Sequence, residues 1–205
     1  MSKISSIGLV AYQGVPGAFG EAAIERVWGT TARAFPVPTF SAALEALRND
    51  DVMWAVIPVW NSCVGDVLST RDALDTYARD VERVHEIEIP IRLALMALPG
   101  TSLSDVRYIA SQPTALAQCA RLFDTLPHVT KCEASNTAGA ARDLAAYGRV
   151  ISAWHARLPV ESPRQLAVIA SERAARRYEL AVLRRDVHDD PANRTRFAVF
   201  TRRPS

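Results

Sequence analysis

The sequence contains little cysteine, little net charge and no long apolar segment, and each absence excludes a class of protein. Its three cysteines, Cys63, Cys119 and Cys132, are odd in number and form no CxxC pair. This argues against a disulfide framework or a structural zinc site and favours a reducing compartment. The formal charge of +2 is too small for a nucleic-acid surface. The apolar run that ends at Gln13 is too short for a signal peptide or a membrane span. We therefore expect a cytoplasmic protein with no nucleic-acid and no membrane partner.

Common catalytic and cofactor motifs are also missing. No GxSxG or HExxH occurs, and the four histidines show no metal-ligand spacing. Gly14, Gly17 and Gly20 form GxxGxxG instead of the dinucleotide GxGxxG, and Val37 ends the second strand where an acidic residue would bind ribose. We expect no metal and no cofactor. A site of this kind works by positioning and electrostatics.

Short apolar runs alternate with amphipathic stretches along the chain, which predicts an α/β fold with mostly parallel sheets flanked by helices. Strands are expected at 7–12, 32–37, 53–59, 106–111, 129–133, 166–170, 181–187 and 196–201. Helices are expected at 19–28, 67–77, 114–123, 138–147 and 171–178, with another that runs through Leu47 after an N-cap at Thr39.

The segment Val84–Leu98 differs from the rest, because apolar and polar residues alternate over a length unusual for one strand. Pro90 predicts a break there, with two strands joined at a hinge between two lobes. The chain is expected to return near Ala181–Asp186. The predicted first lobe is discontinuous, residues 1–88 plus 182–205, the second lobe is residues 89–181, and a ligand cleft is expected between them.

Four loops are expected at the carboxyl ends of strands, where open α/β sheets bind ligands. They are residues 13–20, 58–65, 111–114 and 135–138. The last two precede helices, whose N-termini favour anions. Ser111, and Asn136 or Thr137, are alternatively simple N-caps.

Taken together, these loops resemble those of one family. AYQGVPGAFGEAA is similar to the opening motif of prephenate dehydratases, and VIPVWNSCVGDV to their proline-led ENS loop. SQPTALAQC is similar to their SHPQALAQC loop, and SNTAGAAR to their STAEAA segment. VIASERAARRYELAVL and DVHDDPANRTRFAVF resemble the final stretch with its TRF signature. The matches run in order from about residue 8 to residue 200, so the chain is identified as a member of this superfamily.

The resemblance implies a two-lobed periplasmic-binding-protein-like (type II) fold and a lyase of aromatic amino acid and phenylalanine biosynthesis. Family members remove the carboxylate and the 4-hydroxyl of prephenate, which gives phenylpyruvate, water and carbon dioxide. The implied partner is a small prephenate-like dicarboxylate, and the implied assembly is a homodimer or homotetramer. The chain ends five residues after Phe200. We therefore expect no regulatory ACT domain and no feedback by phenylalanine, as suits specialised metabolism.

The resemblance also assigns residues. Thr195 is expected to hydrogen-bond or protonate the leaving hydroxyl as a preorganised donor, and Asn61 and Gln118 are expected to hydrogen-bond substrate. Arg196 either pairs with a carboxylate or forms a structural or exposed salt bridge. The remaining expected substrate-binding residues are Ala18, Phe19, Trp60, Ser62, Ser111, Thr114, Asn136 and Thr137.

The chain departs from the family in those same loops. Trp60 replaces a glutamate, Ala18-Phe19-Gly20 replaces Thr-Phe-Ser, Gln112 and Thr114 replace a histidine and a glutamine, and Asn136 replaces a serine. The stretch 148–165, with Trp154 and His155, is also longer than expected. We interpret this pattern as a pocket altered for another ligand or another reaction outcome, in preference to random sequence drift. The large apolar side chain of Trp60 favours a less charged substrate or an altered proton path.

Two alternatives stay open beside dehydration. One is decarboxylation of prephenate without loss of the hydroxyl, and the other is a catalytically inactive ligand-binding module. Retention of Thr195, Asn61 and Gln118 favours dehydration of prephenate or a close cyclohexadienyl analogue.

Overall fold

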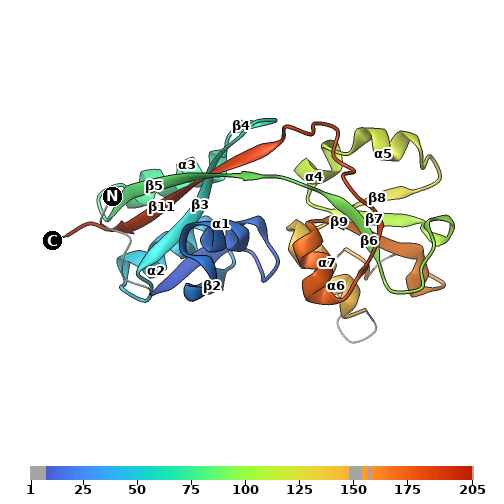
Figure 1. Cartoon of the computed structure of the whole chain (residues 1–205), viewed down its shortest axis with the longest axis horizontal. Helices are drawn as coiled ribbons and strands as arrows, with labels where there is room; N and C mark the ends of the chain where they lie inside the picture. The colour runs from blue at the N-terminus through green and yellow to red at the C-terminus, as the bar shows by residue number, and fades with distance from the viewer. Residues whose placement is uncertain (1–7, 148–153, 157, 205) are drawn as a thin grey trace. The chain divides into compact units, whose positions relative to one another are not determined.

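The computed structural model describes residues 8–147, 154–156 and 158–204, which divide into two compact units (Figure 1). The first unit holds the described residues up to Val15, together with Phe19–Ile91 and the chain from Ala192 onward. The second holds Pro16–Ala18 and Arg92–Pro191. The expected crossings at 88/89 and 181/182 therefore lie at 91/92 and 191/192, and the excursion at residues 16–18 was not anticipated.

The first unit is built on one mixed sheet with the strand order β2-β1-β3-β11-β5, and β4 pairs with β3. Its strands are β1 (Leu9–Gln13), β2 (Arg33–Val37), β3 (Trp54–Asn61), β4 (Gly65–Asp66), β5 (Val81–Pro90) and β11 (Arg194–Arg202), and its α-helices are α1 (Phe19–Trp28), α2 (Phe40–Arg48) and α3 (Leu68–Tyr77). Strand β1 is parallel to β2 and β3, whereas β11 is antiparallel to β3 and β5. The long pair of β5 and β11 is visible in Figure 1.

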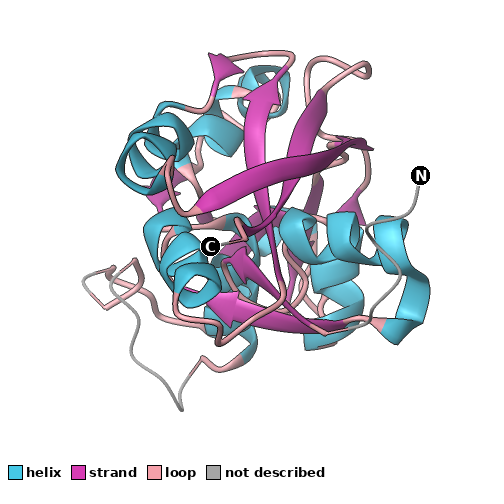
Figure 2. Ribbon diagram, turned by 90° about the vertical axis from the view of Figure 1, so that its left-hand side faces the viewer, coloured by secondary structure: helices cyan, strands magenta, loops and turns pink. Residues whose placement is uncertain are grey.

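The second unit has a mixed five-stranded sheet with the order β10-β6-β9-β7-β8. Its strands are β6 (Ala94–Ala97), β7 (Tyr108–Ser111), β8 (Thr130–Glu133), β9 (Leu166–Ala170) and β10 (Ala181–Arg184), and its α-helices are α4 (Pro113–Ala117), α5 (Ala120–Asp124), α6 (Thr137–Ala145) and α7 (Glu172–Tyr178). Strand β7 is parallel to β8 and β9, and β6 is antiparallel to β9 and β10. Figure 2 shows the strands of both units in magenta and their helices in cyan.

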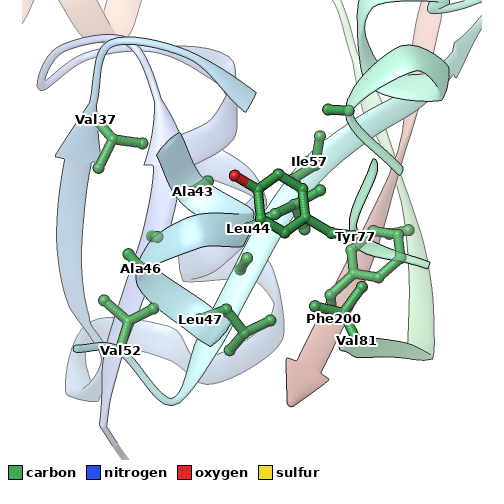
Figure 3. Packing of buried hydrophobic residues seen from close by; sticks show 14 residues of the cluster. Val37, Ala43, Leu44, Ala46, Leu47, Val52, Ile57, Tyr77, Val81 and Phe200 are labelled. Carbon is green, nitrogen blue, oxygen red and sulfur yellow. The ribbon is translucent and has the colours of Figure 1, made fainter. Parts of the chain in front are cut away.

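The helices of the first unit cover its sheet through apolar side chains. One buried cluster joins α2 and α3 to β1, β3 and β11, with Leu44 and Tyr77 among its larger members (Figure 3). Helix α2 begins as expected, because Thr39 Oγ1 accepts a hydrogen bond from the Ala42 N–H at 3.0 Å. Burial of this cluster makes the sheet a rigid support for the loops at its strand ends.

The predicted α/β class, with two sheets flanked by helices, is confirmed, with two differences in detail. Both sheets are mixed instead of mostly parallel. The return of the chain also comes later than expected, because β10 still pairs with β6 in the second sheet, with Ala181 opposite Ala97. The break at Pro90 is confirmed, since β5 ends there and β6 begins at Ala94.

Candidate active site

The residues expected to act on substrate fall in both units. The first unit holds Phe19, Trp60, Asn61, Ser62, Thr195 and Arg196, and the second holds Ala18, Ser111, Thr114, Gln118, Asn136 and Thr137.

Three buried polar side chains meet where β3 and β11 pair, and we call Asn61, Asn193 and Thr195 the polar cluster. They are 8%, 2% and 8% exposed, respectively. The Asn61 Nδ2 donates to Thr195 Oγ1 at 2.9 Å and to Asn193 Oδ1 at 2.9 Å. Asn61 and Thr195 are also register partners in the sheet. The structure therefore brings together two of the three residues that were expected to be catalytic, and adds Asn193.

The backbone around the polar cluster is fixed by Ser62 and Cys63. The Ser62 N–H donates to the Arg194 carbonyl at 2.9 Å, and the Arg194 N–H donates to Ser62 Oγ at 3.0 Å. The Cys63 N–H donates to Asn61 Oδ1 at 2.9 Å. Both polar atoms of the Asn61 side chain are thus engaged by the protein. Direct binding of substrate by Asn61 stays a prediction. The Nδ2 group also lies 3.1 Å from the Arg194 carbonyl, so its two protons already have acceptors in the protein, whereas Oδ1 keeps a second lone pair that could accept from a substrate.

Trp60 and Arg196 lie on the other face of the sheet from the polar cluster, as alternation along a strand requires. The Arg196 guanidinium carbon is 5.1 Å from the Trp60 ring centroid, and that of Arg194 is 5.9 Å away. Both arginines also pair with Glu88, at 3.1 Å from Arg196 and 3.2 Å from Arg194. Of the two interpretations for Arg196, the geometry favours the exposed salt bridge, which contributes little to stability.

Two residues of the second unit that were expected to bind substrate instead form hydrogen bonds with its backbone. Ser111 Oγ, which is completely buried, donates to the Ile169 carbonyl at 2.6 Å and so ties β7 to β9. Asn136 Oδ1 accepts from the Gly139 N–H at 2.6 Å, which is the N-cap bond of α6. The N-cap interpretation therefore holds for Asn136 and is wrong for Ser111, because Gln112 is the N-cap residue of α4.

Gln118 lies at a break in the helix that was expected to run from 114 to 123. Helix α4 ends at Ala117 and α5 begins at Ala120, which shows that the sequence pattern concealed the interruption. Asp189 holds this break, because its carboxylate accepts from the N–H groups of Ala120 at 2.8 Å and Arg121 at 3.0 Å. The Asp189 N–H in turn donates to the Gln118 carbonyl at 2.7 Å. Gln118 is half-buried at this turn, whereas Thr114 on α4 is exposed.

The tip of the first loop belongs to the second unit. Ser171 Oγ, at the N-cap of α7, donates to the Gly17 carbonyl at 2.9 Å, and the Tyr178 hydroxyl donates to the Pro16 carbonyl at 2.7 Å. Gly17 has a φ of 92°, which disfavours any side chain there. The backbone beside Ala18 is therefore held firmly by α7.

Among the described residues, the ionisable groups with an altered pKa all belong to the second unit: Asp105, Cys119, Cys132 and His155. Burial raises the pKa of the Cys119 thiol to about 12, with a further contribution from the charge of Asp189. Burial likewise raises the pKa of Cys132 and lowers that of His155. Cys63 is exposed. The polar cluster itself consists of two amides and a hydroxyl, so it acts by hydrogen bonding at any physiological pH.

Sequence reasoning missed Asn193 and Asp189 as contributors. Both stand in the segment DVHDDPANRTRF, where Asp, Pro and Asn also read as ordinary turn formers. The resemblance covered this segment but assigned a role only to its last residues. Part of the long stretch at 148–165 lies outside the described residues, and within it Trp154 and His155 are buried.

In residues 8–147, 154–156 and 158–204, no three His, Cys, Asp or Glu side chains gather as a metal site would need. Over those same residues, no helix is long and apolar enough to span a membrane.

The sequence profile of the prephenate dehydratase family matches residues 10–205. Arogenate dehydratase/prephenate dehydratase 2 of Arabidopsis thaliana, described as chloroplastic, is 34% identical over 195 residues, which cover 95% of this chain and 46% of the relative. Arogenate dehydratase 1 of Petunia hybrida is 35% identical over 196 residues, covering 95% and 42%. The chain thus spans less than half of the length of these relatives.

Solved structures give a similar result. Prephenate dehydratase from Arthrobacter aurescens in complex with L-Phe is 30% identical, with a TM-score of 0.80 over 96% of this chain and 61% of that one. GqqA, described as a quorum quenching acylase, is 28% identical, with a TM-score of 0.77 over 96% and 65%.

Proposed function

Because this chain belongs to the prephenate dehydratase family, we propose that it is a carbon–oxygen lyase that dehydrates and decarboxylates prephenate or a close analogue. The C–C bond to the ring carboxylate breaks and releases carbon dioxide. Its electron pair moves through the ring diene, which becomes aromatic, and the C–O bond at the opposite ring carbon breaks. Hydroxide leaves and takes up a proton to become water.

The observation that supports this proposal best is the polar cluster. Thr195 Oγ1 accepts a hydrogen bond from Asn61 Nδ2, which leaves its own proton for another acceptor. We propose that this acceptor is the departing hydroxyl of the substrate. Charge develops on that oxygen in the transition state, and one preorganised donor aimed at such a charge typically contributes about 10²–10³ in rate.

We further propose that the second unit contributes Gln118 to the same reaction. Its half-buried position at the α4–α5 break, held by Asp189, is a rigid one for a neutral donor. A donor held on a rigid turn loses little entropy when it binds substrate.

The substrate is either prephenate or arogenate, which carries an amino group in place of the side-chain ketone. The name of the Arabidopsis relative includes both substrates, and the name of the Petunia relative includes arogenate alone. The test is to mix purified protein with each at neutral pH, and to identify products by mass spectrometry and ultraviolet absorbance. Phenylpyruvate from prephenate, or phenylalanine from arogenate, at an enzymic rate supports dehydration. Acyl-amide hydrolysis serves as the control reaction, since one similar structure is named an acylase.

A second candidate is non-aromatising decarboxylation, favoured by one observation. Trp60 stands where the family has a glutamate, and its ring packs against Arg194 and Arg196. This reaction predicts a decarboxylated product that keeps its hydroxyl. Thr195→Ala separates the two candidates, because it should abolish dehydration and leave decarboxylation largely intact. Intact substrate with tight binding would instead indicate an inactive binding module.

A further inference from the structure

We propose that Asn193 is a positioning residue that acts through Asn61 to keep the Thr195 hydroxyl a hydrogen-bond donor. This inference rests on the proposed function, because it explains how that hydroxyl is made available to a leaving group. Asn193 itself is 2% exposed, and its side-chain oxygen accepts a hydrogen bond from Asn61.

The polarity of the Asn61 amide decides which way the Thr195 proton points. An amide has a carbonyl oxygen that only accepts and an NH₂ group that only donates. With the NH₂ group toward Thr195, the hydroxyl oxygen accepts and its proton is left for substrate. With the amide turned over, the Thr195 proton would be donated to Asn61 Oδ1 and lost to catalysis.

Three contacts fix the amide in the productive direction. The Cys63 N–H can only donate, and it lies 2.9 Å from Asn61 Oδ1, so the carbonyl oxygen must face Cys63. Asn193 Oδ1 accepts from Asn61 Nδ2 at 2.9 Å, and the Arg194 carbonyl lies 3.1 Å from the same nitrogen. A turned amide would lose these bonds and would place its oxygen against two other oxygens, which is strongly unfavourable.

Asn193 is itself held by the backbone of the first unit. Its carbonyl accepts from the Ile91 N–H at 2.8 Å, and the next residue, Arg194, is clamped by Ser62. The backbone that carries the Asn193 side chain is therefore held by the residues that directly follow β5 and β3, the two strands that flank β11 in the sheet. This arrangement suits a residue whose task is to orient another.

The test is a double-mutant cycle on the purified chain. Asn193→Ala removes the acceptor and should lower kcat about ten- to a hundredfold, with KM changed less than about threefold. Asn193→Asp keeps a side-chain oxygen toward Asn61 and should restore kcat to within about threefold of wild type. Asn49→Ala is the matched control, because Asn49 is an exposed asparagine in the same unit, and it should behave as wild type.

The cycle separates positioning from a general structural effect. In a Thr195→Ala background, Asn193→Ala should have no further effect on kcat, because there is no hydroxyl left to orient. The proposal would be overturned if the two substitutions lowered kcat independently, so that their effects multiplied in the double variant. It would also be overturned if Asn193→Asp folded but did not recover kcat. Circular dichroism and thermal melting confirm that each variant is folded.

Failure of the proposed function gives a different signature. If wild type turns over neither prephenate nor arogenate, the proposed function is wrong. The effect of Asn193 on the Asn61 amide can then still be measured by NMR. The Asn61 side-chain NH₂ signals, assigned by their loss in Asn61→Ala, should exchange with solvent slowly in wild type and in Asn193→Asp. They should exchange at least about tenfold faster in Asn193→Ala. Equal exchange in all three proteins would contradict the inference.

Discussion

The two units use the residues that resemble the family's functional positions in different ways. In the first unit, Asn61 and Thr195 bond to each other across strands that are 134 residues apart in the sequence. In the second unit, Ser111 and Asn136 bond to backbone groups, one across the sheet and one within its own helix turn. The same kind of resemblance therefore identified a cluster of side chains in one unit and structural supports in the other.

The difference shows what makes a polar residue a candidate for chemistry. A hydrogen bond between two side chains is a minority case in proteins, and a buried one is retained only with a full set of partners. A cap bond such as that of Asn136 is explained by the helix it begins. We therefore expect substitutions in the polar cluster to change turnover, and those at Ser111 and Asn136 to change stability.

The largest expected effect, after loss of Thr195 itself, follows replacement of Asn61. Asn61→Leu removes the donor to Thr195 and leaves the Cys63 N–H and the Asn193 oxygen without their partner. We expect kcat to fall about 10²-fold and the free energy of unfolding to fall by about 1–3 kcal/mol. Steady-state kinetics and denaturant melts measure the two. If Asn61→Leu were stable and fully active, the polar cluster of the first unit would differ in no functional way from the structural residues of the second.

Asp189 is the place where the second unit is expected to affect turnover. Asp189→Ala removes the acceptor for two N–H groups at the start of α5 and frees the Gln118 turn. We expect kcat/KM to fall about tenfold, since a small displacement of a positioned donor is costly. Asp189→Asn, which keeps one side-chain oxygen, should lie between. If Gln118→Ala and Asp189→Ala leave kcat/KM unchanged, catalysis depends on the first unit alone.

Replacement of the supporting residues should affect stability with little change in rate. Asn136→Ala removes an N-cap, which costs about 0.5–2 kcal/mol, with kcat kept within about twofold. Thr39→Ala is a matched control, because Thr39 makes the same type of cap on α2 in the first unit. Denaturant melts and steady-state kinetics should show the same pattern for both variants, which is a loss of stability with little change in kcat. A loss of kcat in Asn136→Ala but not in Thr39→Ala would contradict this and would support a role for Asn136 in substrate binding.

The smallest expected effect concerns the thiols. Cys63 is exposed, whereas the pKa of Cys119 is raised to about 12 and that of Cys132 is also raised, so at pH 7–8 their thiolate fraction is very low. Ellman's reagent should label one thiol quickly in the native protein and all three only after unfolding. Cys63→Ser should abolish the fast phase. Rapid labelling of a second thiol would show that the second unit opens readily.

Much of this fold could be predicted from periodicity, because α1, β9 and the cap at Thr39 follow from local sequence. The break between α4 and α5 could not, since its cause, Asp189, lies about 70 positions away in the chain. The late return of the chain was missed for the same reason, because pairing of β10 with β6 is a long-range contact. Thr195 and Asn61 were found through the resemblance, whereas Asn193 needed the hydrogen-bond geometry.

The most direct test of the central claim compares aromatic product formation by wild type, Thr195→Ser and Thr195→Ala with prephenate and with arogenate. The account predicts that Thr195→Ser keeps the hydroxyl and most of the activity, while Thr195→Ala loses about 10²–10³ in kcat and stays folded. Aromatic product formed at the wild-type rate by Thr195→Ala would contradict the account, because the hydroxyl held by Asn61 would then have no part in expelling the leaving group.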